Sequence, residues 1–172
     1  MPTTDLQDNL ARQHLYSFML TCHRTDRSDI FGGLAVPAAH HEEIIRALCG
    51  EGHTLIVAPR GSAKTTLVQG FIEWTLGRAS LSGDKHWAQR QRILYLSHAA
   101  HRAYSVSLAI MQTIEGQALY HNVFPKVKPS PKKWAETEWR LKGNEGTPHA
   151  NFMAAGIDSP PLGGRFDLIV LD

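Results

Sequence analysis

The sequence predicts an α/β fold with a mainly parallel sheet that is flanked by helices. Two observations support this. A short apolar run at 54–57 is followed by a glycine-bearing loop and then by an apolar pattern of helical period at 67–76. Later in the chain, apolar runs at 93–96 and 166–171 read as buried strands, and the first of them precedes a long helical segment. Strands that alternate with helices are typical of parallel α/β sheets.

The first part of the chain reads as helical. Apolar residues recur at helical spacing between Leu6 and Cys22, so an amphipathic helix is expected over about residues 5–25. The polar, glycine-bearing stretch 26–33 is expected to be a loop. Pro37 can begin a second helix that runs to Leu48. We therefore divide the chain into an N-terminal helical segment, 1–36, and a domain over 37–172.

The remaining elements follow from apolar runs and turn residues in chain order. They are a strand at about 53–57, a helix from the loop to about Gly77, a polar loop at 78–91, a strand at 93–96, a helix at 99–114, a proline- and lysine-rich connection at 123–133, a strand at 134–141 that pairs with 151–155, and a last strand at 166–171.

Composition and charge narrow the function classes. The net charge of +2 over 172 residues is too small to indicate a nucleic-acid partner by itself. Cys22 and Cys49 lack metal-type spacing and are expected to be buried free thiols in a reducing compartment. No signal pattern and no apolar run of the ~20 residues that a bilayer requires is present, so a cytoplasmic protein without a membrane partner is expected.

The loop at 58–66 carries the strongest functional signal. Its sequence is Ala-Pro-Arg-Gly-Ser-Ala-Lys-Thr-Thr. Against the Walker A pattern G-x-x-x-x-G-K-[ST], Ala58 and Ala63 stand at the two glycine positions, and Gly61 lies between them. A phosphate loop binds its ligand through successive backbone N–H groups and the positive end of a helix dipole. The expected strand before this loop and the expected helix after it are the context in which such a loop occurs. A chance helix start rich in small residues explains the Lys-Thr-Thr run less well.

These residues predict ATP and Mg²⁺ as ligands. Lys64 would reach the β- and γ-phosphate oxygens, and Thr65 would place its hydroxyl on Mg²⁺. Arg60 either pairs with a γ-phosphate or braces the loop. The predicted nucleotide-binding residues are Pro59, Arg60, Gly61, Ser62, Ala63, Lys64, Thr65 and Thr66.

Asp172 ends the last apolar run and is the candidate for a second metal-side group that holds Mg²⁺ through water. Three other acids, Glu145, Asp158 and Asp167, do not follow a strand. A lysine-rich run at 126–133 precedes Trp134 and either contacts nucleic-acid phosphates or forms a solvated loop.

Four stretches together resemble the large terminase subunit of tailed bacteriophages, the motor that pumps DNA into a procapsid. They are the segment 37–45, the loop 58–66 with its internal arginine, the strand and following residues at 92–98, and the segment 164–172, which is similar to the family's R-x-D-L-I-x-x-D motif. The resemblance covers roughly 37–172.

The resemblance implies a P-loop NTPase of the additional-strand, catalytic-glutamate type that hydrolyses ATP with Mg²⁺. Lys64, Arg60 and Asp172 would be catalytic, and Thr65 and Asp172 would hold the metal. Arg165 is the candidate for an arginine offered to a neighbouring subunit's ATP. The implied partners are double-stranded DNA, the portal protein, the small terminase subunit and other copies in a ring, in the host cytoplasm and transiently at the procapsid portal.

In this family an acid that polarises water, a coupling motif and further strands follow the position of Asp172, and one later strand lies beside the strand that ends there. We therefore expect the domain over 37–172 to be incomplete, the C-terminal nuclease domain to be absent from this sequence, and the intact gene to continue. The alternatives are a truncated prophage remnant that only binds nucleotide, and another P-loop ATPase such as a helicase.

Overall fold

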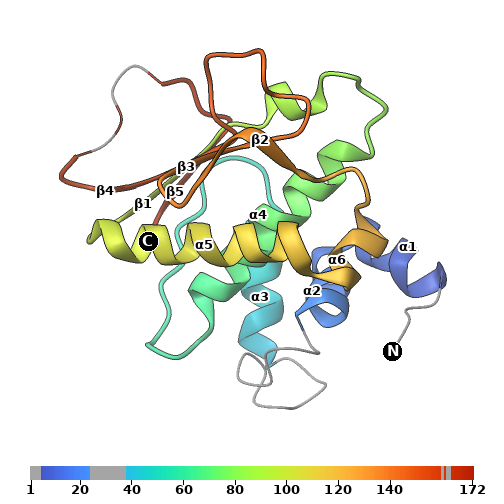
Figure 1. Cartoon of the computed structure of the whole chain (residues 1–172). Coiled ribbons are helices and arrows are strands. Elements are labelled where there is room, and N and C mark those ends of the chain that lie inside the picture. The colour runs from blue at the N-terminus through green and yellow to red at the C-terminus, as the bar shows by residue number, and fades with distance from the viewer. Residues whose placement is uncertain (1–4, 24–37, 160, 162–163) are drawn as a thin grey trace. The chain divides into compact units, whose positions relative to one another are not determined.

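The computed structural model describes residues 5–23, 38–159, 161 and 164–172 (Figure 1). These residues form two compact units, Met1–Arg78 and Ala79–Asp172, and each is described by itself. The predicted loop at 26–33, the predicted helix start at Pro37 and the predicted boundary after residue 36 lie outside the described residues.

The first unit is helical. It contains α1 (Asp5–Gln13), α2 (Leu15–Cys22), α3 (Ala39–Leu48) and α4 (Lys64–Ser80), whose last two residues belong to the second unit. The single helix predicted over 5–25 is wrong, because His14 adopts extended backbone angles, φ −127° and ψ 124°. The carbonyl of Ala11, near the end of α1, accepts a hydrogen bond from the Trp74 indole N–H at 3.0 Å. Trp74 thus binds one of the carbonyls that a helix end leaves without an intrahelical partner.

A close contact between α2 and α4 organises the core of this unit. A Cβ atom on Gly70 would lie 2.1 Å from the Met19 sulfur, so α4 needs a glycine where Met19 packs. The fully buried Glu73 accepts a hydrogen bond from Gln69 and lies 2.8 Å from Nε2 of His23. Cys22 is a buried free thiol, as predicted, and burial together with Glu73 raises its pKa.

The prediction of a buried thiol is wrong for Cys49, which is exposed. Cys49 is the C-cap residue of α3, one position past the end of the helix, whose buried apolar residues are Ile44 and Ile45. An apolar run before a cysteine therefore did not determine its burial.

The predicted strand at 53–57 is also wrong. The backbone of 53–59 carries no strand pairing in the structure, and the side chains of Leu55 and Val57 are 89% and 87% exposed. An apolar segment forms a stable strand only when neighbouring strands pair with its backbone. Thr54 instead donates a hydrogen bond from its hydroxyl to the Ala47 carbonyl.

The second unit is built on a five-stranded sheet. Its elements are the 3-10 helix η1 (Trp87–Arg90), β1 (Ile93–Ser97), α5 (Ala100–Gly116), α6 (Ala118–Val123), β2 (Pro129–Ala135), β3 (Glu138–Leu141), β4 (Phe152–Gly156) and β5 (Leu168–Leu171). The strand order is β2-β3-β4-β1-β5. Strand β1 pairs in parallel with β4 and β5, whereas β3 pairs antiparallel with β2 and β4. The α/β class is confirmed, with a mixed sheet.

The antiparallel part of the sheet differs in detail from the prediction. The expected strand at 134–141 forms as parts of two strands, β2 and β3, and its pairing with the following strand is confirmed. Strand β2 starts inside the stretch predicted as a connection and contains Pro129 and Pro131. Proline is tolerated there because β2 lies at the edge of the sheet.

Helix α5 lies along one face of the sheet (Figure 1). Gly156 allows its close approach, because a Cβ atom there would lie 3.3 Å from the backbone nitrogen of Ala100. The indole N–H of the fully buried Trp139 donates to the Ser107 hydroxyl of α5 at 3.0 Å. Among the described residues, no helix combines the length and the apolar character that crossing a membrane requires.

The buried side chain of Asn151 fastens the loops around β4. Its amide group donates to the carbonyls of Ala88 and Gln91, and its oxygen accepts from the Leu141 N–H and the Asn144 amide. Four hydrogen bonds from one fully buried residue satisfy groups in two separate segments, 88–91 and 141–144.

We predict that Asn151→Leu lowers the free energy of unfolding by about 2–4 kcal/mol, because it leaves buried donors and acceptors without partners. Urea denaturation followed by circular dichroism measures this. Gln112→Ala, at an exposed position of α5, is the control and should change stability by no more than about 0.5 kcal/mol. Equal stability of the two variants would contradict the assigned role of Asn151.

Candidate functional site

Two residues of the loop before α4 have positive φ angles. Gly61 has φ 81°, and Ala63 has φ 57°, in the left-handed region that disfavours side chains. Ala63 occupies the position where the phosphate-loop pattern has glycine. The alanine therefore departs from the pattern in residue type, although its backbone lies in the left-handed region that glycine adopts most readily.

Lys64 closes this loop on itself. Its ammonium donates hydrogen bonds to the carbonyls of Ala58 and Pro59 at 2.7 Å and 2.8 Å, and it lies 3.3 Å from the Ser62 hydroxyl. The Ser62 hydroxyl donates to the Pro59 carbonyl at 2.8 Å. A lysine ammonium has three donors and no acceptor, so these loop oxygens suit its bonding capacity.

The other predicted loop residues surround this closed turn. Lys64 and Thr65 are the first residues of α4, a helix of 17 residues, so the positive end of its dipole faces the loop. The side chains of Pro59, Arg60 and Thr65 are exposed. The loop thus combines a cation, hydroxyl groups and a helix N-terminus, which together suit an anion.

Asp172 follows β5 and is held by β1. Its backbone N–H donates to the Leu96 carbonyl at 2.8 Å, and its Oδ2 accepts a hydrogen bond from the Tyr95 hydroxyl at 2.6 Å. Tyr95 is fully buried, and burial raises its pKa, as does the hydrogen bond to Asp172. The phenol therefore keeps its proton and acts as a donor to the carboxylate.

The position of Asp172 agrees with a general property of parallel sheets. Because β4, β1 and β5 run in parallel, their carboxyl ends lie at one edge of the sheet. Ligands of open α/β sheets bind outside this edge. Ser97, at the end of β1, and the exposed Asp172 both lie there.

Sequence reasoning missed the role of Asp167. Its carboxylate accepts two hydrogen bonds from the Arg92 guanidinium, at 2.9 Å and 2.8 Å, and a third from the Arg92 backbone N–H. These bonds lower the pKa of Asp167 and raise that of Arg92. They join the starts of β1 and β5. The partners are 75 residues apart in the chain, so no local pattern reveals the pair.

In the part of the chain that is described, the structure brings neither Arg165 nor the lysine-rich run at 126–133 together with the other predicted site residues. Arg165 is exposed in the stretch before β5, and the preceding residues 162–163 lie outside the described part. In the run at 126–133, Lys133 lies 2.5 Å from Glu138, and Lys132 donates to the Glu145 carbonyl. Two of its four lysines are therefore engaged by residues of the second unit, Lys133 across the β2–β3 hairpin and Lys132 in the loop after β3.

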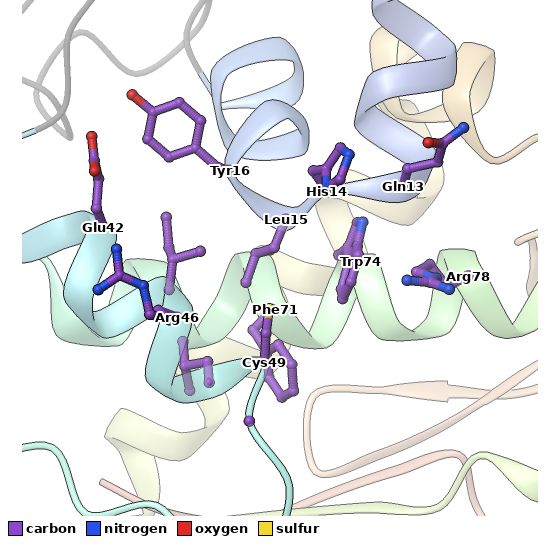
Figure 2. Close-up of a pocket in the computed structure, with 13 residues that line it drawn as sticks. Gln13, His14, Leu15, Tyr16, Glu42, Arg46, Cys49, Phe71, Trp74 and Arg78 are labelled. Atoms are coloured by element: carbon purple, nitrogen blue, oxygen red, sulfur yellow. The ribbon is translucent and has the colours of Figure 1, made fainter.

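The first unit also contains a cavity of about 800 Å³ (Figure 2). Phe71, Trp74 and Arg78 line it from α4, and Arg46 lines it from α3. The Arg78 guanidinium lies 5.0 Å from the centre of the Trp74 ring. None of the predicted nucleotide-binding residues lines this cavity. The cavity adjoins the later turns of α4, whereas the loop precedes its first turn.

The two residues predicted to hold a metal carry oxygen donors, which suit Mg²⁺ better than a transition metal. Among the described residues, no group of three or more His, Cys, Asp or Glu side chains is arranged to hold a metal ion. Mg²⁺ does not need such a cage, because it typically takes one or two protein ligands together with water and substrate phosphates. The hydroxyl of Thr65 and the carboxylate of Asp172 are both oxygen donors of that kind.

No protein-family model matches the chain, and a search of curated proteins gives no match. The terminase assignment is therefore a proposal that rests on the residues of this chain.

We predict that Asp167→Asn reduces stability by up to about 1 kcal/mol at neutral pH. The effect is small because the Asp167 side chain is 41% exposed and solvent screens its ion pair. The lowered pKa of Asp167 means that the native pair stabilises the fold above the ordinary aspartate pKa of about 4. This contribution is lost as the pH falls through the lower, folded-state value.

Thermal melts of wild type and variant between pH 7 and pH 2.5 test this. The difference in stability should be constant near neutrality and shrink below about pH 4. Asp158→Asn, at another exposed aspartate, is the control and should show little difference at any pH. A difference that grows on acidification would show that the ion pair is not its source.

Proposed function

We propose that this chain is the ATP-binding part of a viral DNA-packaging motor similar to the large terminase subunit of tailed bacteriophages. The observation that carries the proposal is the loop before α4. There a glycine-like backbone at Ala63 and the folded-back Lys64 occur in the segment that bears the phosphate-loop pattern.

The loop offers a simple way to bind a nucleotide. Among the described residues, the Lys64 ammonium is bonded to carbonyl oxygens and a hydroxyl oxygen, none of which carries a full charge. A phosphate oxygen is negatively charged, so it attracts the ammonium more strongly than a carbonyl dipole does. Lys64 would therefore move from its own loop to the β- and γ-phosphates, while the backbone N–H groups at the start of α4 receive the phosphate oxygens.

Mg²⁺ would be held by Thr65 and Asp172, and it supplies positive charge that neutralises the phosphate oxygens. Asp172 is suited to this role because Tyr95 and the Leu96 carbonyl fix it at the carboxyl edge of the sheet. Arg60 would contribute to catalysis from within the loop, and Arg165 would act on a neighbouring subunit's ATP. The acid that activates water is expected beyond Asp172.

The proposed fold is a P-loop NTPase of the additional-strand, catalytic-glutamate type. One feature of the structure supports it. Strand β5 lies at the end of the sheet, with Ile169 and Leu171 57% and 69% exposed, and in that fold type a further strand would pair with it there. The segment at 53–57 would also be a strand in that fold type, but it carries no strand pairing in the structure.

The remaining parts of the proposal come from the resemblance. The whole protein would translocate double-stranded DNA in a ring of copies docked on the portal protein, together with the small terminase subunit. It would work in the host cytoplasm.

We predict that Lys64→Ala raises the dissociation constant for Mg-ATP at least ~100-fold, since it removes two or more charge-assisted hydrogen bonds. Isothermal titration calorimetry measures this. Lys85→Ala removes an exposed lysine elsewhere in the chain and serves as the control. Unchanged affinity in Lys64→Ala would reject the loop as the phosphate site.

Hydrolysis is measured separately, on the longest natural form of the protein with and without double-stranded DNA. DNA-stimulated release of phosphate without strand separation is expected. Nucleotide binding without any turnover would favour the prophage remnant, and ATP-dependent unwinding of a duplex would favour a helicase.

A further inference from the structure

A row of neighbouring aromatic side chains crosses the sheet of the second unit. Trp134 of β2, Trp139 of β3, Phe152 of β4 and Tyr95 of β1 follow one another in the order of the strands. Successive ring centres lie 5.2, 4.9 and 6.3 Å apart. The row ends at Asp172, directly after β5, where the Tyr95 hydroxyl meets the carboxylate. Every strand of the sheet thus provides or adjoins one member.

The strand register explains why these side chains meet. Trp134 lies opposite Trp139, and Trp139 lies opposite Phe152. Phe152 lies opposite Ile93, which is two residues from Tyr95 and therefore on the same face of the sheet. Diagonal neighbours on one face are within reach of aromatic side chains. The row is thus a consequence of register.

The inner rings of the row are held firmly. Trp139, Phe152 and Tyr95 are all 0% exposed. Trp139 is anchored by its hydrogen bond to Ser107, and the planes of Trp139 and Phe152 are parallel. Close-packed interiors leave such side chains little freedom. Packing therefore fixes the direction in which the Tyr95 ring presents its hydroxyl to Asp172.

The carboxylate at the end of the row is exposed, yet it is fixed at two points. The Asp172 N–H is bound to the Leu96 carbonyl, and Oδ2 accepts the Tyr95 hydroxyl at 2.6 Å. The first bond places the backbone and the second restricts rotation of the carboxylate. Both come from β1. Metal-binding carboxylates are commonly oriented by hydrogen bonds of this kind from outer groups.

We propose that Tyr95 is a positioning residue that orients the Asp172 carboxylate for a divalent cation bound with a nucleotide. The inference rests on the proposed function, because it assigns Asp172 to the metal. Loss of an outer hydrogen bond typically costs 10–100-fold in metal affinity. A merely structural Tyr95 would contribute to stability but would leave metal affinity unchanged.

Tyr95→Phe tests the proposal, because it removes the hydroxyl and keeps the ring that stacks on Phe152. The probe is Mn²⁺, whose binding to the full chain is followed by electron paramagnetic resonance at saturating concentration of a non-hydrolysable ATP analogue. The Mn²⁺ dissociation constant should rise about 10-fold. Tyr120→Phe, which removes a hydroxyl from another fully buried tyrosine of the same unit, is the control and should leave it unchanged.

Asp172→Asn and the double variant separate the possible failures. If the proposed function holds, Asp172→Asn weakens Mn²⁺ binding, and adding Tyr95→Phe has little further effect because the two residues act through one carboxylate. If Asp172→Asn leaves Mn²⁺ affinity unchanged, the assignment of Asp172 to the metal fails. If Asp172→Asn weakens binding and Tyr95→Phe behaves like Tyr120→Phe, only the role of Tyr95 is overturned.

Discussion

Strand β1 is the constraint on which the second unit depends. It is paired in parallel on both sides, with β4 and β5, and all five of its residues are buried. Parallel pairing aligns the carboxyl ends of three strands at one edge. It also lets β1 hold Asp172 twice, through the Tyr95 hydroxyl and the Leu96 carbonyl. The Arg92–Asp167 pair fixes the opposite ends of β1 and β5, so the register that presents Asp172 is secured at both ends.

The loop before α4 depends on a different interaction. Lys64 is bonded to carbonyls of its own loop, and Ala63 as well as Gly61 has a left-handed backbone conformation in this closed turn. A non-glycine residue held in that region costs about 1 kcal/mol or more and is commonly found at functional sites. The strain at Ala63 and the lysine together distinguish this helix start from an ordinary one. The cavity along α4 is lined neither by a lysine nor by a residue with a positive φ angle.

Continuous apolar runs were the most reliable guide to the sheet, because strands that are buried on both faces are apolar throughout. This reasoning found β1, all of whose residues are buried. The apolar run at β5 also proved to be a strand, but that strand is not buried on both faces, because Ile169 and Leu171 are exposed. It failed at 53–57, where the sequence provides apolar residues but the described chain provides no neighbouring strand. It failed at His14, because helical spacing continues across the break. Strand β2 was not predicted at its full length, because its prolines indicated a connection and not an edge strand. In the candidate site, the loop was predicted from its pattern, whereas the contact of Tyr95 with Asp172 depends on folding across 77 residues.

If a nucleotide binds at the loop before α4, the amides of that loop should be protected. Hydrogen–deuterium exchange of the full chain, with and without Mg²⁺ and a non-hydrolysable ATP analogue, measures this protection. Exchange of the amides at 60–67 should become slower on nucleotide binding, because N–H groups at the start of the helix donate to phosphate oxygens. Exchange at 42–50 and 71–78, around the cavity of Figure 2, should change little. Protection around the cavity with none at 60–67 would contradict nucleotide binding at the loop.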